Sequence, residues 1–309
     1  MSYVNQAWMR SVERTTTPLY RRVIYDLVRP MLSARARTFL SPEFLAEVAP
    51  DMALFGRGFP LEHRRRWATQ GLNLSGTTIL VQGTGTGWDV VGWASLKPKK
   101  IIATDLFPFD DSWPEIAAYC RDTHGVEVEF RQAPLEAHAF LDDASVDLCV
   151  SDAVFEHCRD LPAVMAETMR VLRPGGLVYA SYGPLWYAPG GDHFSGRSTL
   201  DDYYNHVLLE PAAYQRFFAT HREPVEDFQS GGRYVELDLF SKLTTRDYLK
   251  IFRDAGFTRE SLRLELSWYA VQFRERHGDK MGPLLARNSG KADKDDLLVT
   301  ANFIRLRRP

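Results

Sequence analysis

The sequence has few cysteines and no excess of charge of one sign. Its three cysteines, Cys120, Cys149 and Cys158, are too few and too irregularly spaced for a disulfide framework or a zinc site. A total of 38 Lys and Arg against 40 Asp and Glu gives a formal net charge of −2. This balance argues against a protein that captures nucleic acid or anionic lipid mainly by charge. We therefore expect a reducing compartment and a globular fold.

Long apolar runs are also missing. Two long stretches without a charged residue, 71–88 and 174–191, are interrupted by Gly, Pro and other residues that a membrane-spanning helix would not carry together. The first six residues, Met-Ser-Tyr-Val-Asn-Gln, lack the basic and then apolar pattern of a secretory signal. We expect a cytoplasmic protein with neither a membrane nor a nucleic acid as partner, and leave open whether it is a homodimer.

The apolar pattern divides the chain into a preface and a larger unit. Over residues 1–75 apolar residues recur every three or four positions, which predicts a helical N-terminal cap. From residue 76 to 309 short β-branched runs alternate with helical segments, which predicts an α/β domain with a mostly parallel sheet and helices on both faces. The predicted strands are 78–81, 100–104, 126–130, 146–150 and 177–181, with helices at 112–123 and 161–171 between them.

A long segment interrupts this alternation at about 183–241. It is aromatic and rich in glycine at first and polar afterwards, and segments of this length in compact domains usually serve function. We expect an inserted lid there. Beyond it, a helix is predicted over residues 244–255 with Thr244 as its N-cap, followed by strands at 262–269 and 297–306.

A glycine-rich loop follows the first of the strands predicted in the α/β domain. It reads Gln82-Gly83-Thr84-Gly85-Thr86-Gly87 and precedes a predicted helix, so the backbone can approach a ligand closely beside free helical N–H groups. The spacing is not that of a dinucleotide site, because Trp88 stands where the third glycine would be. Asp105 ends the next strand and is placed to accept hydrogen bonds from ribose hydroxyls, the alternative being an Asp that only caps a turn.

Taken in order along the chain, these features resemble class I S-adenosylmethionine-dependent methyltransferases of the small-molecule type. The resemblance implies a Rossmann-like, seven-stranded sheet whose last strand is antiparallel, and S-adenosylmethionine as the cofactor. The residues that carry it are the glycine loop, Asp105, residues 132–135, residues 145–152, the pair Glu156-His157, and Leu172-Arg173-Pro174-Gly175-Gly176.

The resemblance also implies which residues bind the cofactor. Asp105 would hold the ribose, and Leu106 would pack on the adenine. The family usually has an acidic residue two positions before the first glycine, which helps to position the methionine amino group, but this chain has Val81 there. That task would pass to Gln82, Asp152 or backbone carbonyls. The full predicted cofactor set is Gln82, Gly83, Thr84, Gly85, Gly87, Asp105, Leu106, Ala133, Leu135 and Asp152.

The acceptor and the chemistry at its reacting atom are less constrained. We predict in-line methyl transfer to an oxygen of a small molecule, with His193 in the glycine-rich loop as general base and no metal. The alternatives are N- or C-methylation on the same fold, and a binding protein that has lost catalysis. The residues expected to bind the acceptor are Trp186, Tyr187, Phe194, Tyr203 and His206.

Overall fold

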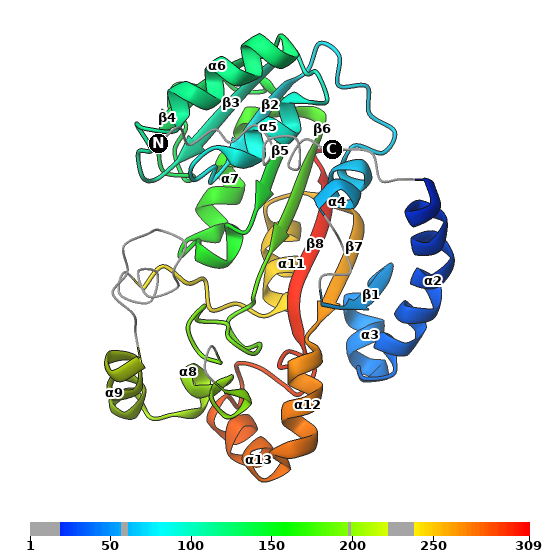
Figure 1. The fold of residues 1–309 in the computed structure, drawn as a ribbon, viewed down its shortest axis with the longest axis vertical. Coiled ribbons are helices and arrows are strands. Elements are labelled where there is room, and N and C mark those ends of the chain that lie inside the picture. Colours follow the sequence, from blue (N-terminus) through cyan, green and yellow to red (C-terminus); the bar gives the residue numbers. More distant parts are fainter. Residues whose placement is uncertain (1–18, 57–60, 197–198, 222–237) are drawn as a thin grey trace.

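A mixed β-sheet runs through the centre of the molecule, with helices on both of its faces (Figure 1). The computed structural model describes residues 19–56, 61–196, 199–221 and 238–309. Within these residues eight strands form one sheet in the order β1-β7-β8-β6-β5-β2-β3-β4. The strands are β1 (Met52–Phe55), β2 (Thr78–Gln82), β3 (Lys100–Asp105), β4 (Glu127–Gln132), β5 (Val146–Asp152), β6 (Leu172–Tyr182), β7 (Thr258–Leu266) and β8 (Val299–Arg307).

The strand directions confirm the predicted α/β class. Strand β8 runs antiparallel to both β6 and β7, and every other neighbouring pair is parallel. The predicted count of seven strands is wrong by one, because β1 pairs with β7 in register from Met52 opposite Arg263. The preface expected to be helical therefore contains a strand. Its four residues are too few to show a period of two in the sequence.

The helices follow the predicted alternation closely. They are α2 (Leu19–Arg37), α3 (Pro42–Val48), α4 (Leu61–Ala68), α5 (Trp88–Ala94), α6 (Trp113–His124), α7 (Leu161–Val171), α8 (Asn205–Leu208), α9 (Pro211–His221), α11 (Thr245–Asp254), α12 (Trp268–Arg276) and α13 (Gly278–Arg287), with short 3-10 helices η1 (Phe155–His157) and η2 (Leu200–Asp202). Among the described residues, every helix is too short or too polar to cross a membrane.

One predicted strand is too long at its C-terminal end. The expected strand 262–269 ends at Leu266, and helix α12 begins two residues later. The reason is Ser267, whose hydroxyl accepts a hydrogen bond from the Ala270 N–H at 3.3 Å and so caps the helix. By contrast, the predicted N-cap Thr244 is confirmed, because Thr244 and Asp247 form a reciprocal capping box on α11.

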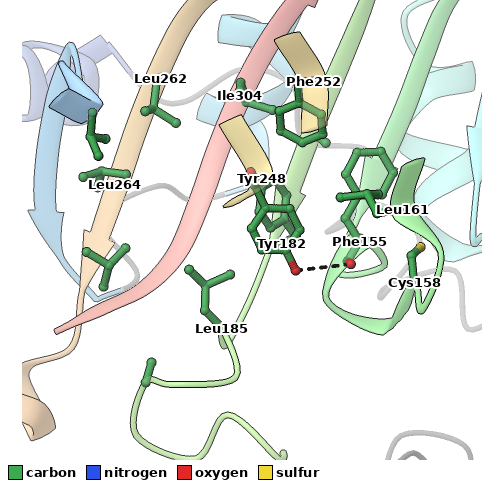
Figure 2. Close-up of a cluster of buried hydrophobic side chains, with 14 of the residues drawn as sticks. Phe155, Cys158, Leu161, Tyr182, Leu185, Tyr248, Phe252, Leu262, Leu264 and Ile304 are labelled. Atoms are coloured by element: carbon green, nitrogen blue, oxygen red, sulfur yellow. Dashed lines mark hydrogen bonds between the residues drawn. The ribbon is translucent and has the colours of Figure 1, made fainter. Parts of the chain in front are cut away.

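Two apolar cores lie on opposite faces of the sheet. Along β2, Ile79 and Val81 join the core beneath α5 and α6, whereas Leu80 joins the core beneath α7 and α11. This alternation is expected for a sheet that is covered on both sides. In the second core Tyr248 reaches from α11 to donate a hydrogen bond to the Phe155 carbonyl at 3.3 Å (Figure 2). This bond brings the start of η1 close to α11.

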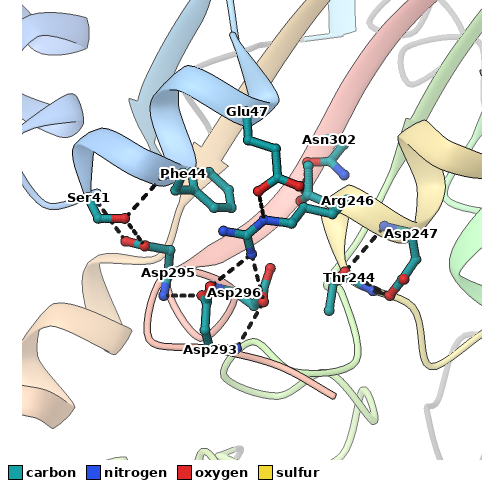
Figure 3. A network of polar contacts seen from close by, with 11 residues as sticks. Ser41, Phe44, Glu47, Thr244, Arg246, Asp247, Asp293, Asp295, Asp296 and Asn302 are labelled. Atoms are coloured by element: carbon teal, nitrogen blue, oxygen red, sulfur yellow. Dashed lines mark hydrogen bonds and ion pairs between the residues drawn. The ribbon is translucent and has the colours of Figure 1, made fainter. Parts of the chain in front are cut away.

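A charged network fastens the segment around α3 to the rest of the molecule (Figure 3). Arg246 on α11 forms ion pairs with Glu47 at 2.6 Å, Asp293 at 2.9 Å and Asp296 at 3.2 Å. Beside it, Asp295 accepts hydrogen bonds from Ser41, the N-cap of α3. The preface is thus joined to the sheet by a strand and by side chains, and the boundary predicted at residues 75 and 76 stays a prediction.

The segment expected as a lid contains η2, α8 and α9. Of these, η2 lies against α12 and α8 lies against α13, beyond the ends of β6 and β7 (Figure 1). The Asn288 amide at the end of α13 donates a hydrogen bond to the Val207 carbonyl on α8 at 3.0 Å. Residues 197–198 and 222–237 of the segment lie outside the described residues.

Candidate cofactor and acceptor site

A cavity of about 390 Å³ opens at the carboxyl ends of the central parallel strands. Four loops surround it, one after each of β2, β3, β4 and β5, which is where open α/β sheets bind their ligands. The described residues that line it are Gly83, Thr84, Gly85, Thr86, Trp88, Asp89, Asp105, Leu106, Phe107, Phe109, Pro134, Leu135, Glu136, Ala153, Val154, His157, Cys158, Arg159 and Leu239.

The glycine loop needs its glycines for two different reasons. Gly83 has a φ of 69°, and a Cβ there would overlap the Val154 side chain, so no larger residue fits. Gly85 has a φ of 50°, but a Cβ there would meet nothing within 4 Å. Gly85 therefore faces open space on the cavity side and leaves the backbone accessible. The indole N–H of Trp113 donates a hydrogen bond to the Gly85 carbonyl at 2.8 Å and fixes the loop.

Asp105 links the glycine loop to the loop after β3. Its carboxylate accepts hydrogen bonds from the Gly85 N–H at 2.7 Å and from the Phe107 N–H at 3.0 Å. Burial raises the pKa of this carboxyl group, and the N–H groups of Phe107, Gly85 and Leu106 partly offset that effect. A carboxylate among apolar walls can accept hydrogen bonds from ribose while the walls hold an adenine. The residues present therefore fit S-adenosylmethionine.

Six of the ten residues predicted to bind the cofactor line the cavity. These are Gly83, Thr84, Gly85, Asp105, Leu106 and Leu135. Gly87 begins α5 with a φ of 93°, and the Ala133 N–H donates to the Asp105 carbonyl at 2.9 Å, so both shape the backbone around the cavity without lining it.

Gln82 and Asp152 face elsewhere. The Gln82 amide is fully buried and donates to the Thr168 hydroxyl on α7 at 3.0 Å. Asp152 accepts hydrogen bonds from the Tyr179 hydroxyl at 2.7 Å and from the Ser181 hydroxyl on β6. Neither side chain lines the cavity.

The structure adds lining residues that the sequence did not single out. Phe107, Phe109 and Val154 provide apolar walls, and Asp89 provides a carboxylate from the first turn of α5. An acidic residue in the first turn of a helix is common because it favours the helix dipole, so its position alone gave no signal of binding. The aromatic pair in Leu106-Phe107-Pro108-Phe109 follows Asp105 directly, and that closeness was the available signal.

Two histidines meet at the edge of the cavity. His157 lines it, and the His193 ring lies 4.7 Å from the His157 ring, centroid to centroid. Phe240 packs against both rings, at 5.0 Å and 5.4 Å. Burial, and then the neighbouring His193, lower the pKa of His157 to about 2, so His157 is neutral at physiological pH. The predicted base is thus one ring away from the cavity.

His193 is held in place by the residue before it. The buried Asp192 carboxylate accepts hydrogen bonds from the N–H groups of Phe194 and Ser195, at 3.1 and 2.7 Å, and from the Tyr214 hydroxyl on α9 at 2.6 Å. His193 itself has a φ of 60°, in the left-handed region that few residues other than glycine adopt. The loop that carries the predicted base is therefore fixed to α9 within the same lid segment.

Glu156, His157 and His193 form a group that could hold a metal ion. Their candidate ligand atoms lie within 4.8 Å of one another. A metal held by a His193 nitrogen would compete with the general base predicted at that ring. We retain the prediction of a site without metal.

The residues predicted to bind the acceptor pack mainly against the lid segment and α12. Phe194 contacts Phe218 at 4.8 Å, Tyr203 stacks on Tyr269 at 5.0 Å, and a His206 ring nitrogen lies 2.6 Å from the Trp186 carbonyl oxygen. None of the five predicted residues lines the described cavity. Trp186 is connected to it through Phe240, which lies 5.0 Å away. A smaller cavity of about 170 Å³ adjoins the first at Ala153.

Comparison with known proteins finds methyltransferases among the sequence relatives. Residues 80–180 match the family described as "Methyltransferase domain". A malonyl-[acyl-carrier protein] O-methyltransferase of Serratia marcescens is 36% identical over 108 residues, which is 34% of this chain and 38% of the relative. An uncharacterized methyltransferase of Mycobacterium avium (strain 104) is 32% identical over 161 residues, 52% of this chain and 57% of the relative. The chain thus matches between about two fifths and three fifths of these relatives.

A solved structure of an S-adenosylmethionine-dependent methyltransferase from Mesorhizobium loti aligns with 80% of this chain and 97% of its own, at 17% identity and a TM-score of 0.48. Residues 80–180, about a third of the chain, match a methyltransferase domain in the region where the order of motifs predicted one. S-adenosylmethionine is the cofactor of the class I methyltransferases that the order of motifs resembles.

Proposed function

We propose that this chain is an S-adenosylmethionine-dependent methyltransferase that transfers a methyl group to an oxygen of a small-molecule acceptor, with His193 as general base. The observation that carries the proposal is the pair of rings at the cavity edge, His157 and His193, with His193 fixed by its own loop. The O-methyltransferases among the relatives support oxygen as the acceptor atom. The aromatic lid residues would bind the acceptor from the side opposite the sheet.

The cofactor supplies a methyl group on a positively charged sulfur, which is displaced in line by the acceptor. The glycine loop and Asp105 would orient it, with the apolar walls around Leu106 and Leu135 excluding water from the adenine. His193 would remove the proton from a hydroxyl acceptor, because histidine ordinarily titrates near neutral pH. The neutral His157 beside it adds no positive charge at the edge of the cavity.

The test is turnover by wild-type protein and the His193→Ala variant against phenols and alcohols, carboxylic acids and amines, measured as release of S-adenosylhomocysteine. We expect a hydroxyl acceptor, a loss of about 100-fold or more in kcat in the variant, and unchanged affinity for S-adenosylhomocysteine. The matched control is His221→Ala, an exposed histidine at the end of α9. Activity should persist in the presence of a chelator.

Three results would contradict the proposal. Full turnover of a hydroxyl acceptor by the His193→Ala variant would remove the base role. Methylation of amines or carbon alone would favour N- or C-methylation on the same fold. Binding of the cofactor without turnover across all acceptor classes would favour the non-catalytic alternative.

A further inference from the structure

A carboxylate in the first turn of α5, that of Asp89, lines the cavity. In the resembling family an acidic residue two positions before the first glycine helps to position the methionine amino group, and this chain has Val81 there. Val81 is 3% exposed and packs in the core beneath α5. The substitution therefore removes a charge from the cofactor site and adds an apolar side chain to the core.

Two residues considered from the sequence as substitutes, Gln82 and Asp152, do not line the described cavity. The Gln82 amide donates to Thr168 on the opposite face of the sheet, and the Asp152 carboxylate accepts from Tyr179 and Ser181. Of the acidic side chains that line the described cavity, Asp105 already accepts two backbone N–H groups, and Glu136 is exposed on the loop after β4. The remaining one is Asp89.

The charges around Asp89 come from two other elements. A guanidinium nitrogen of Arg65 on α4 lies 3.8 Å from a carboxylate oxygen of Asp89, which is too far for a hydrogen bond. Among the described residues, the Asp89 carboxylate has this ion pair as its polar contact. Arg64 adds a second positive charge from α4, and Asp152 at the end of β5 adds a negative one. Burial and then Asp152 raise the pKa of Asp89 to about 6, against the effect of both arginines.

Arg65 cannot move closer easily. It is 1% exposed, and a Cβ on Gly92 of α5 would overlap its guanidinium group, so the side chain fills a tight space against that helix. Asp89 therefore keeps hydrogen-bonding capacity directed into the cavity. A positively charged donor that entered beside Asp89 and Asp152 would relieve the repulsion between the two carboxylates.

We propose that Asp89 binds the α-ammonium group of S-adenosylmethionine and takes over the task of the acidic residue that Val81 replaces. The inference rests on the cofactor site of the proposed function and concerns only how its amino-acid end is held. Asp89 is half-buried and lies in the first turn of the helix that the glycine loop begins. It is therefore a cofactor-positioning residue, whose loss should leave the adenine and ribose contacts intact.

Two ligands separate this role from a general effect on the loop. S-adenosylhomocysteine carries the α-ammonium group, whereas 5′-methylthioadenosine keeps the adenine, ribose and sulfur and lacks the amino-acid part. We expect Asp89→Asn to weaken S-adenosylhomocysteine by about tenfold to a hundredfold, as for loss of a charge-assisted hydrogen bond, and to leave 5′-methylthioadenosine within about twofold. Asp110→Asn, on the exposed turn before α6, is the matched control.

Titration calorimetry on the full chain decides between the outcomes. Equal weakening of both ligands would assign Asp89 to the shape of the loop, and unchanged binding of both would remove it from the site; either result overturns the inference. If wild-type protein bound neither ligand, the cofactor site itself would be wrong, which is a different failure. Rescue by Asp89→Glu of part of the affinity for S-adenosylhomocysteine alone would support the charge as the cause.

The pH dependence gives a second readout. Below a pH of about 6 Asp89 becomes protonated and loses the charge that pairs with the ammonium group. The affinity of wild-type protein for S-adenosylhomocysteine should therefore fall as the pH drops from 7.5 to 5.5. The Asp89→Asn variant should lack this fall, and so should 5′-methylthioadenosine with either protein. The same fall in the variant would contradict the inference.

Discussion

At the scale of single residues, Asp105 couples the glycine loop to the loop that follows β3. Replacing it by asparagine keeps the size of the side chain but removes the charge that accepts from the Gly85 and Phe107 N–H groups. We expect Asp105→Asn to lower the affinity for S-adenosylhomocysteine by about tenfold or more, because a charge-assisted hydrogen bond to ribose is lost. Titration calorimetry measures the change. An affinity equal to that of wild-type protein would show that the ribose is held elsewhere.

Glu156 should make the stability of the protein depend on pH. Its side chain is 2% exposed and accepts a hydrogen bond from the Gly183 N–H at 3.0 Å, and burial raises its pKa to about 8. Between pH 4.5 and 8 the folded state therefore holds a proton that the unfolded chain has released. Its contribution to the free energy of unfolding falls as the pH rises, by at most about 1.4 kcal/mol per pH unit.

Glu156→Gln tests this effect because glutamine still accepts from Gly183 and does not ionise. We expect the variant to gain stability relative to wild-type protein between pH 5 and pH 8, in urea unfolding without ligand. Other buried carboxyl groups contribute equally to the pH dependence of both proteins, so their contribution cancels in the difference between the two free energies of unfolding. Parallel pH curves for the two proteins would show that Glu156 is ionised in the folded state.

The residues of the site differ in how well the sequence could predict them. The glycine loop and Asp105 could be predicted from the sequence because tight turns and strand ends require particular residue types at set spacings. Asp152 was expected in the site from its strand end, but its side chain turns to Tyr179 and Ser181, which only the paired strands bring near. The role of Tyr203 was predicted from composition, and its stacking on Tyr269 depends on a helix far along the chain.

At the scale of elements, β1 depends on Asp51 to reach its place beside β7. The Asp51 carboxylate accepts from the Leu262 N–H at 2.9 Å and from the Ser261 hydroxyl, and the Asp51 N–H donates to the Leu262 carbonyl at 2.8 Å. We expect Asp51→Ala to lower the free energy of unfolding by about 1–2 kcal/mol with unchanged affinity for S-adenosylhomocysteine. Asp111→Ala, an exposed residue before α6, is the control for chemical unfolding.

An unchanged stability in Asp51→Ala would show that β1 is held by the sheet hydrogen bonds and the packing of α2 alone. The strands at the centre of the sheet were predictable because they are buried on both faces and read as continuous apolar runs. Strand β1 was not, because four residues carry no period and its partner β7 lies about 200 positions away. The start of α12 was missed for a related reason, since the apolar run continues from β7 across the Ser267 cap.

At the scale of the whole molecule, the region that matches a methyltransferase domain is residues 80–180. The segments before and after it add further strands and helices to the molecule. The preface completes one edge of the sheet with β1, and α8 and α9 gather with α12 and α13 at one end (Figure 1). The candidate cofactor cavity lies at the carboxyl ends of the central strands, and His157, His193 and Phe240 pack together at its edge. We therefore expect acceptor choice to reside in the added helices.

The most direct test of the account is calorimetric titration of the full chain with S-adenosylhomocysteine. The account predicts one site per chain with an affinity in the micromolar range, and a melting temperature that rises with ligand concentration as mass action requires. Absence of binding at millimolar ligand would contradict the central claim that the cavity at the ends of β2, β3 and β5 is a cofactor site.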